Sequence, residues 1–271
     1  MILCFLSGCA STAERGIDTD VPSSVSGNYD ERAVGEAIHR EILAQFRPYT
    51  DPKVVGYVNN IITELAQSAK RKDLNYRGTI LYNERIYATS APGGYIYVTT
   101  GMLNFLDNEA ELAAVLAHEI AEQQYKDPRF KISDDVITTV AQAGSKVGPM
   151  FGPIGSLASL GLALLEAYSQ GTQKTPEELL LESDENAMEY LLKAGYDPQA
   201  LLDVLRHFLR AEDKVIPFFY DYYQSRPITK ERMTHLREEF QKLPLNEKEL
   251  KTNALEYQEI TRGVREIYKT M

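Results

Sequence analysis

The feature that most constrains this chain is a predicted helix from Asn108 to about Tyr125, which is apolar for most of its length but carries ionisable residues. Asn108 is a favourable N-cap residue, and the acidic Glu109 and Glu111 follow in the first turn, where the helix dipole favours negative charge. Apolar residues then continue up to the stretch Leu116–Glu122. This helix is therefore the first place to look for chemistry.

The stretch Leu116–Glu122 reads Leu-Ala-His-Glu-Ile-Ala-Glu. Two His at positions i and i+4 of a helix lie about 40° apart on one face and can ligate one ion. A Glu beside the first His can then take a proton from metal-bound water. Here His118 and Glu119 are present, but the second His position is Glu122. On its own this pattern is a weak signal.

The rest of the chain predicts a helical protein with one short β-rich block. Residues 31–72 show two helical stripes separated by Asp51-Pro52, a helix-start signal. Later helices are expected over 179–194, ended by Gly195, and over 198–212 and 229–243. The uncharged stretch 147–165 contains prolines and glycines, so we interpret it as a buried or lid-like hairpin rather than a membrane span. The expected strands are 79–82, 85–89 and 95–99, with a turn at Pro92-Gly93-Gly94.

The N-terminus predicts a lipid anchor. The two cysteines are Cys4 and Cys9, and Leu6-Ser7-Gly8-Cys9 matches a bacterial lipobox, in which Cys9 is lipidated. Residues 1–8 would then be a signal remnant and 9–30 a tether to the membrane. No basic residue precedes Cys9, which departs from the usual signal, and the alternative is an apolar N-terminus with a buried cysteine. The net charge of -10 argues against a nucleic-acid partner.

Two segments carry a family resemblance: Ala91–Leu103 (APGGYIYVTTGML) and Asn108–Glu119 (NEAELAAVLAHE). They resemble the CAAX prenyl protease and HtpX type of zinc metallopeptidase, in particular its periplasmic lipoprotein branch of β-barrel assembly-enhancing proteases. The match continues through Asp184–Leu191 and covers roughly residues 31–243. The resemblance implies an α+β fold: a mostly helical, gluzincin-like domain over 31–245 with a small antiparallel sheet against the His118 helix, followed by a C-terminal helical tail over 246–271.

The same resemblance shows how far the metal site departs from the family, whose cofactor is zinc. Besides the exchange of the second His for Glu122, the family's third ligand, a Glu, aligns with Leu180, or near Gln173 in another register. A further His near the metal aligns with Arg226. Three of the four metal-facing positions are therefore substituted. One imidazole holds zinc poorly against water, so we expect zinc to be absent or weakly bound.

Two further expectations concern this site. Arg226 brings a fixed positive charge, and we hypothesise that it pairs with Glu119 or Glu122 in place of an ion. Alternatively, His118, Glu122 and Asp184 could together bind a metal, and such an oxygen-rich set suits manganese or magnesium better than zinc. In the family, the residue aligned with Asp184 more often supports the first His through a hydrogen bond. The family also usually has Asn at the position of Tyr87, so the edge of the substrate cleft is altered as well.

The favoured interpretation is a catalytically impaired pseudo-peptidase. It would be anchored on the periplasmic side, at the outer membrane of a Gram-negative bacterium, where it binds unfolded or extended polypeptide or aids outer-membrane protein quality control. Two alternatives stay open. One is an active metallo-endopeptidase with Glu119 as the base and an altered ligand set; the other is a purely structural envelope lipoprotein.

Overall fold

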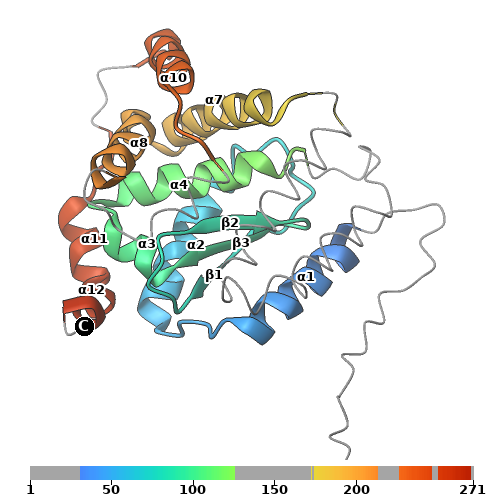
Figure 1. Cartoon of the computed structure of the whole chain (residues 1–271), viewed down its shortest axis with the longest axis vertical. Helices are drawn as coiled ribbons and strands as arrows, with labels where there is room; N and C mark the ends of the chain where they lie inside the picture. The colour runs from blue at the N-terminus through green and yellow to red at the C-terminus, as the bar shows by residue number, and fades with distance from the viewer. Residues whose placement is uncertain (1–30, 126–171, 173, 213–225, 246–249, 270–271) are drawn as a thin grey trace, which may run out of the picture.

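The computed structural model of the protein describes residues 31–125, 172, 174–212, 226–245 and 250–269 (Figure 1). The N-terminal half contains α1 (Glu31–Gln45), α2 (Pro52–Ala66), β1 (Arg77–Leu81), β2 (Ala88–Ala91), β3 (Tyr95–Thr99), α3 (Thr100–Phe105) and α4 (Glu109–Glu122). The C-terminal half contains α7 (Pro176–Ala194), α8 (Gln199–Glu212), α10 (Lys230–Lys242), α11 (Ala254–Ile260) and α12 (Arg262–Lys269).

The three strands form one sheet in the order β1-β3-β2. The expected α+β fold with a small sheet is confirmed, but the sheet is mixed rather than wholly antiparallel. The hairpin β2–β3 is antiparallel, with Ala91 opposite Tyr95, whereas β1 runs parallel to β3, with Arg77 opposite Tyr95. The chain reverses direction after β1 and again after β2. Strand β3 therefore runs in the direction of β1 and pairs with it.

The sheet is covered on both faces, and Figure 1 shows it between α1 on one side and α4 with α7 on the other. On the α1 side, His39 stacks on Tyr95 with ring centroids 4.6 Å apart, and its Nδ1 lies 2.9 Å from the hydroxyl of Tyr97. Gly35 allows this close packing, because a Cβ there would lie 2.0 Å from the carbonyl oxygen of Pro92. All residues of β2 and β3 are consequently buried.

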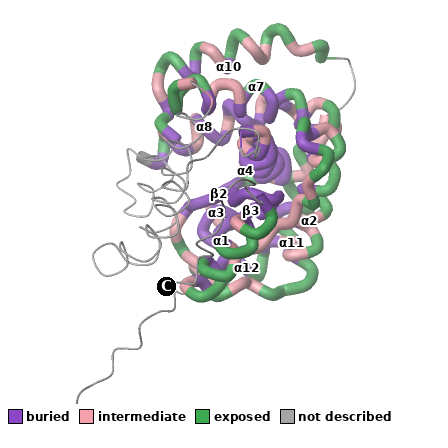
Figure 2. Tube along the Cα trace, turned by 90° about the vertical axis from the view of Figure 1, so that its right-hand side faces the viewer, coloured by how far each residue is buried: buried purple, intermediate pink, exposed green. Residues whose placement is uncertain are grey.

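Helix α4 is the centre of the domain. Every residue from Glu109 to Ala121 is buried, including His118 and Glu119. Helices α7, α8, α2 and strand β2 surround it, and Figure 2 shows it as a buried segment enclosed by more exposed helices. A helix buried on all sides places its ionisable residues away from water, so each one needs a partner inside the protein.

Most helix boundaries follow the local signals in the sequence. Asp51 caps α2, its carboxylate accepting from the backbone N–H of Lys53 at 2.9 Å, and Pro52 is the first helical residue. Gly195 ends α7 with a φ of 83°, which lies in the left-handed region that favours glycine. The strand expected over 85–89 instead begins at Ala88, because the backbone N–H of Tyr87 donates to the side-chain oxygen of Thr99 before regular pairing starts.

Several sequence expectations lie outside the described residues. These are the lipidation of Cys9, the tether over 9–30, the hairpin over 147–165 and the alternative ligand position at Gln173. The proposed boundaries at 245 and 246 stay a prediction, although α11 packs on α2 and α4, and α12 on α3. Within the described ranges, no helix is both long and apolar enough to cross a bilayer.

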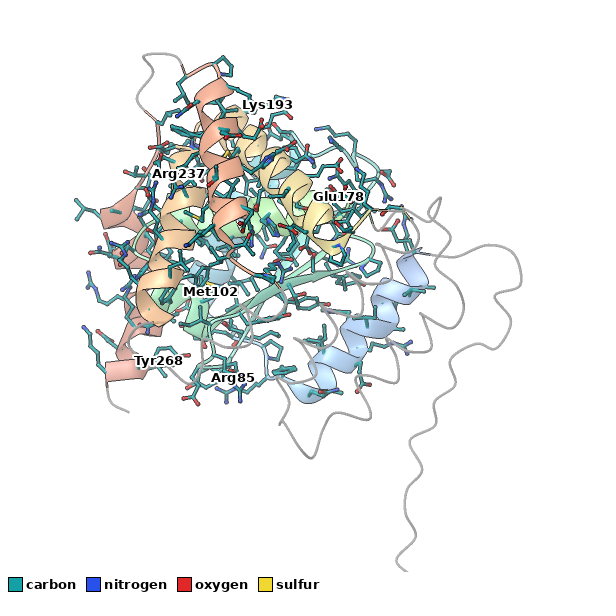
Figure 3. All side chains as sticks on the ribbon, turned by 45° about the horizontal axis from the view of Figure 1, so that its top comes forward. Arg85, Met102, Glu178, Lys193, Arg237 and Tyr268 are labelled. Carbon is teal, nitrogen blue, oxygen red and sulfur yellow. The ribbon has the colours of Figure 1, made fainter. Side chains whose placement is uncertain are left out.

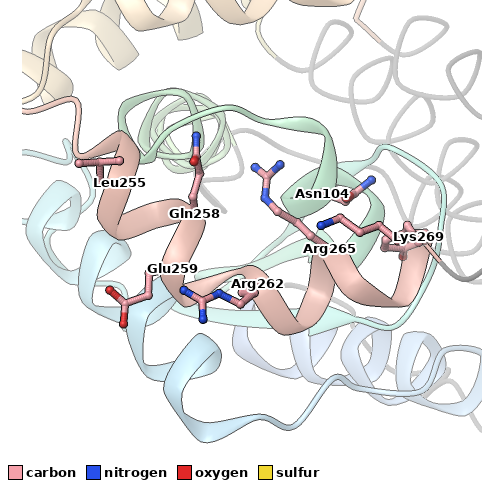
Figure 4. Close-up of a pocket in the computed structure, with 8 residues that line it drawn as sticks. Asn104, Leu255, Gln258, Glu259, Arg262, Arg265 and Lys269 are labelled. Carbon is pink, nitrogen blue, oxygen red and sulfur yellow. The ribbon is translucent and has the colours of Figure 1, made fainter.

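A surface hollow of about 830 Å³ lies where α3 meets α11 and α12 (Figure 4). Polar and basic side chains, among them Arg262, Arg265 and Lys269, line it. None of the residues that the sequence predicts for the metal site contributes to this hollow. The candidate site is therefore elsewhere, in the interior around His118.

Candidate metal centre

Helix α4 brings His118, Glu119 and Glu122 together. The side chain of Asn108 accepts from the backbone N–H of Glu111 at 2.9 Å and so fixes the start of the helix, as expected. Four residues of helix place His118 and Glu122 on one face, and His118 Nε2 lies 3.2 Å from Glu122 Oε1. The nitrogen that could hold a metal ion is thus already in contact with a carboxylate of the same helix.

Helix α7 supplies Asp184 on the other side of the imidazole. Thr175 and Glu178 form a reciprocal capping box that sets the start of α7. Asp184 is fully buried, and its Oδ1 lies 2.8 Å from His118 Nδ1. This contact orients the ring of His118 in the way that a carboxylate supports a metal-binding histidine.

Arg232 at the start of α10 holds Asp184, and sequence reasoning missed it. Its guanidinium makes a bidentate pair with Asp184, with Nε–Oδ2 at 2.7 Å and Nη2–Oδ1 at 2.9 Å. Helices α7 and α10 lie side by side; Figure 3 labels Glu178 and Lys193 on the first and Arg237 on the second. The one available signal was indirect: a buried aspartate needs a cationic or hydrogen-bonding partner.

Arg226 lies over the acidic face of α4. Its Nη2 is 2.7 Å from Glu119 Oε1 and donates to Glu122 Oε2 at 3.0 Å, while its Nε donates to Glu122 Oε1 at 3.2 Å. The structure thus places Arg226 against both carboxylates named in the sequence hypothesis. The backbone at Arg226 is also held in place, because Arg232 Nη1 donates to the carbonyl oxygens of Arg226 and Pro227, each at 3.2 Å.

These contacts join six side chains into one buried ionic network: Glu119, Glu122, Asp184, Arg226, Arg232 and His118. Three carboxylates face two guanidinium groups, so a protonated imidazole makes the network electrically neutral. Burial opposes the charged form of His118, but hydrogen bonds to Asp184 and Glu122, together with their charges, outweigh it and raise the pKa of His118 above 6.5. When His118 is protonated, the charges within the network therefore balance without an added ion.

The pKa of Asp184 is also set by burial acting against nearby positive charge. Burial acts to raise the pKa of Asp184, but the charge of Arg232, with help from the hydrogen bond to His118, lowers it to about 2. A carboxylate with this pKa is ionised throughout the physiological range. It therefore serves as a permanent anchor for both His118 and Arg232.

The described residues do not fit a zinc site. Leu180, at the position of the family's third ligand, is buried and offers no lone pair. His118 Nε2 is opposite Glu122, and a guanidinium lies 2.7 Å from Glu119, where it would repel a divalent cation. Structural and catalytic zinc sites need at least three protein ligands, and among the described residues only His118 and Glu122 offer donor atoms at the family's ligand positions.

The alternative ligand set of His118, Glu122 and Asp184 is not favoured by the geometry. Asp184 meets Nδ1 of His118, whereas Glu122 meets Nε2, the other ring nitrogen. An ion bound to one ring nitrogen of His118 would thus lie near only one of these two carboxylates, because the other carboxylate is on the opposite side of the ring. Both oxygens of Asp184 also accept from Arg232.

The edge of the sheet borders this network. Arg226 Nη1 donates to the carbonyl oxygen of Ala88 at 3.5 Å, and Gln123 Nε2 donates to that of Ala91 at 3.1 Å. Strand β2 is an edge strand, so these two side chains occupy backbone acceptors beside the site. Tyr87, where the family usually has Asn, is buried just before this strand.

Comparisons with known proteins find relatives that are named as peptidases. The chain is 26% identical over 186 residues to the beta-barrel assembly-enhancing protease of Yersinia pestis, a match that covers 65% of this chain and 37% of that protein. It is 24% identical over 261 residues to a putative beta-barrel assembly-enhancing protease of Vibrio cholerae, covering 90% and 52%. Over 115 residues it is 27% identical to the mitochondrial metalloendopeptidase OMA1 of Schizosaccharomyces pombe, covering 41% and 34%.

The chain spans between about a third and a half of the length of these curated relatives. The model of peptidase family M48 matches residues 52–240, which run from the start of α2 to the last turn of α10 and include every member of the ionic network. The matched domain includes the sheet and the buried helix α4 with its altered HExxE motif. The chain therefore belongs to peptidase family M48.

Proposed function

We propose that this protein is a non-catalytic, lipid-anchored envelope member of family M48 that binds extended polypeptide. The observation that carries the proposal is the position of Arg226. Its guanidinium contacts both Glu119 and Glu122, the two carboxylates that would otherwise face a metal ion and its water. The site keeps the form of a metallopeptidase but holds an arginine in place of the cation.

Loss of hydrolysis follows from this arrangement. A peptidase of this kind needs a polarised water and a carboxylate that is available to take its proton. Glu119 is fully buried and paired with Arg226 at 2.7 Å, so its negative charge is already compensated. No second imidazole lies within the network. The described residues therefore provide neither the metal-bound water nor a poised base.

The support for polypeptide binding is the edge strand. Among the described strands β2 has a neighbour on one side only, and an extended segment can add to such an edge through backbone hydrogen bonds once the side chains that bury β2 move aside. The contact from Arg226 to Ala88 O is 3.5 Å long, at the limit of a hydrogen bond, so an incoming peptide N–H would displace it at little cost. The relatives named as beta-barrel assembly-enhancing proteases suggest unfolded envelope polypeptides as the ligand class.

The location belongs to the same proposal. Its support is the lipobox that ends at Cys9 together with relatives whose names refer to β-barrel assembly, which takes place in the outer membrane of Gram-negative bacteria. Ala10, rather than Asp, follows Cys9 and favours the outer membrane by analogy with lipoprotein sorting. Metabolic labelling with a palmitate analogue tests it: wild type should be labelled and Cys9→Ser should not.

The test of function uses protein purified without a metal-affinity step. Unfolded, reduced casein serves as the probe, and wild type is compared with Glu119→Gln and with a chelator-treated sample. We expect saturable binding of casein, no cleavage in any sample and no effect of the chelator. Chelator-sensitive cleavage that Glu119→Gln abolishes would establish the active endopeptidase instead. Absence of both binding and cleavage would favour the structural lipoprotein.

A further inference from the structure

A second group of metal-ligating side chains lies at the opposite end of α4 from the ionic network. Asp107 lies just before α4 and Glu111 in its first turn, and His207 comes from α8, which packs beside α4 (Figure 1). Seven residues of helix separate Glu111 from His118, which corresponds to about 10 Å along the axis. The two groups share no residue, so they can be tested independently.

His207 lies at ion-pair distance from both carboxylates, too far for a hydrogen bond to either. His207 Nδ1 lies 3.8 Å from Asp107 Oδ2 and 3.7 Å from Glu111 Oε2, and the three donor atoms all lie within 4.8 Å of one another. These distances exceed a hydrogen bond. Two ligands with bonds of about 2.1 Å at a tetrahedral centre are about 3.4 Å apart, so a small inward movement would close the site.

The imidazole of His207 leaves a nitrogen for such an ion. Its Nδ1 atom is buried, and no hydrogen-bond partner for it is found among the described residues. The ring is held in place by stacking on Phe105, with centroids 4.1 Å apart. A buried, oriented nitrogen without a hydrogen bond is costly unless another group completes its environment.

The carboxylates of Asp107 and Glu111 also have features that suit metal binding. Glu111 is buried, and its Oε2 accepts from the backbone N–H of Asp107 at 2.8 Å, which fixes its orientation. The Asp107 side chain is 70% exposed and leaves an entry path from solvent. Two carboxylates outweigh the partial positive charge of about half a unit at the start of α4.

We propose that Asp107, Glu111 and His207 bind one divalent transition-metal ion, for which zinc serves as the probe. One imidazole and two carboxylates form an oxygen-rich set that can hold manganese as well as zinc, and water would complete the coordination. The ion would join α8 to the segment before α4. This goes beyond the proposed function, because a chain that has lost metal at His118 would still carry one zinc ion here.

The experiment is a zinc titration against a competing chelating dye, with the full chain purified without a metal-affinity step. Asp107→Asn removes a ligand at an exposed position where folding is not at risk, and His207→Phe keeps an aromatic ring on Phe105. His235→Phe is the matched control: His235 also lies beside acidic residues, but its Nε2 is already 2.7 Å from Glu185. His118→Gln tests the ionic network separately.

We expect one zinc ion per wild-type chain, unchanged in His118→Gln and His235→Phe and bound at least about 10- to 100-fold more weakly in Asp107→Asn and His207→Phe. Zinc should also raise the melting temperature of wild type but not of Asp107→Asn. Unchanged zinc affinity in both ligand variants, or no zinc bound by wild type, would overturn this inference. Zinc lost in His118→Gln would instead contradict the proposed function.

Discussion

The two ends of α4 both bury carboxylates but neutralise them differently. At the start, Glu109 accepts from the hydroxyl of Tyr57, from that of Tyr196 at 2.8 Å and from the side-chain amide of Asn253 at 2.7 Å. These donors carry no charge. At the far end, the carboxylates around His118 are matched by guanidinium groups.

The difference shows what each region requires. Glu109 lies in the first turn of the helix, where the dipole stabilises its charge, so neutral donors suffice for this carboxylate. Burial and the neighbouring Glu109 raise the pKa values of Tyr57 and Tyr196, which therefore remain protonated donors. Three carboxylates in one buried place need positive charge. In this chain, Arg226 and Arg232, from the other half of the domain, provide that charge.

Removal of Arg232 should have the largest effect on stability and so tests this difference most strongly. Arg232→Met leaves Asp184 buried without its cation and should lower the free energy of unfolding by about 3–5 kcal/mol. Urea denaturation measures the effect. Arg237→Ala, at an exposed position of the same helix, is the control and should change it by less than about 0.5 kcal/mol. The double variant Arg232→Met/Asp184→Asn should recover part of the loss; a loss as small as that of the control would show that the pair is unimportant.

Arg226→Ala comes next. It removes the guanidinium that faces Glu119 and Glu122, and we expect a loss of about 2–4 kcal/mol, less than for Arg232 because Glu122 is partly exposed. The same denaturation series measures it. Stability equal to that of wild type would mean that the carboxylates do not depend on this guanidinium, and the account of Arg226 as a replacement for the ion would fail.

The pH dependence of stability sharpens the comparison further. The folded pKa of Asp184 is about 2, below its ordinary 3.8, so its contribution is present above pH 3.8 and is lost as pH falls towards 2, by roughly 2 kcal/mol. The folded pKa of His118 is raised, so its contribution is complete below pH 6.5 and is lost as pH rises through the folded value. Unfolding followed across pH should show wild type losing more stability below pH 3.8 than Asp184→Asn does.

The smallest effect is expected at the start of α4. Glu109→Gln keeps one side-chain oxygen as an acceptor but removes the charge, so it should cost only about 1–2 kcal/mol. Its effect should also vary little with salt, because its partners are neutral. A cost as large as that of Arg232→Met would show that the two ends of α4 do not differ in the way described.

The sequence predicted those features that depend on neighbouring residues. The cap at Asn108, the left-handed end at Gly195 and the strand Tyr95–Thr99 are local patterns, and all three are present. The parallel pairing of β1 with β3 was not predicted, because strand order is decided by contacts between distant segments. Arg232 was missed for the same reason: it lies 48 residues from Asp184 and has no local motif. Arg226 could be found only because a family position drew attention to it.

The most direct test of the central claim is a crystal structure of the protein grown with zinc, with diffraction data collected on both sides of the zinc absorption edge. The account predicts no anomalous peak within bonding distance of His118 Nε2, and the guanidinium of Arg226 in contact with Glu119 and Glu122. A zinc peak bound to His118, with Arg226 displaced from the two carboxylates, would contradict it.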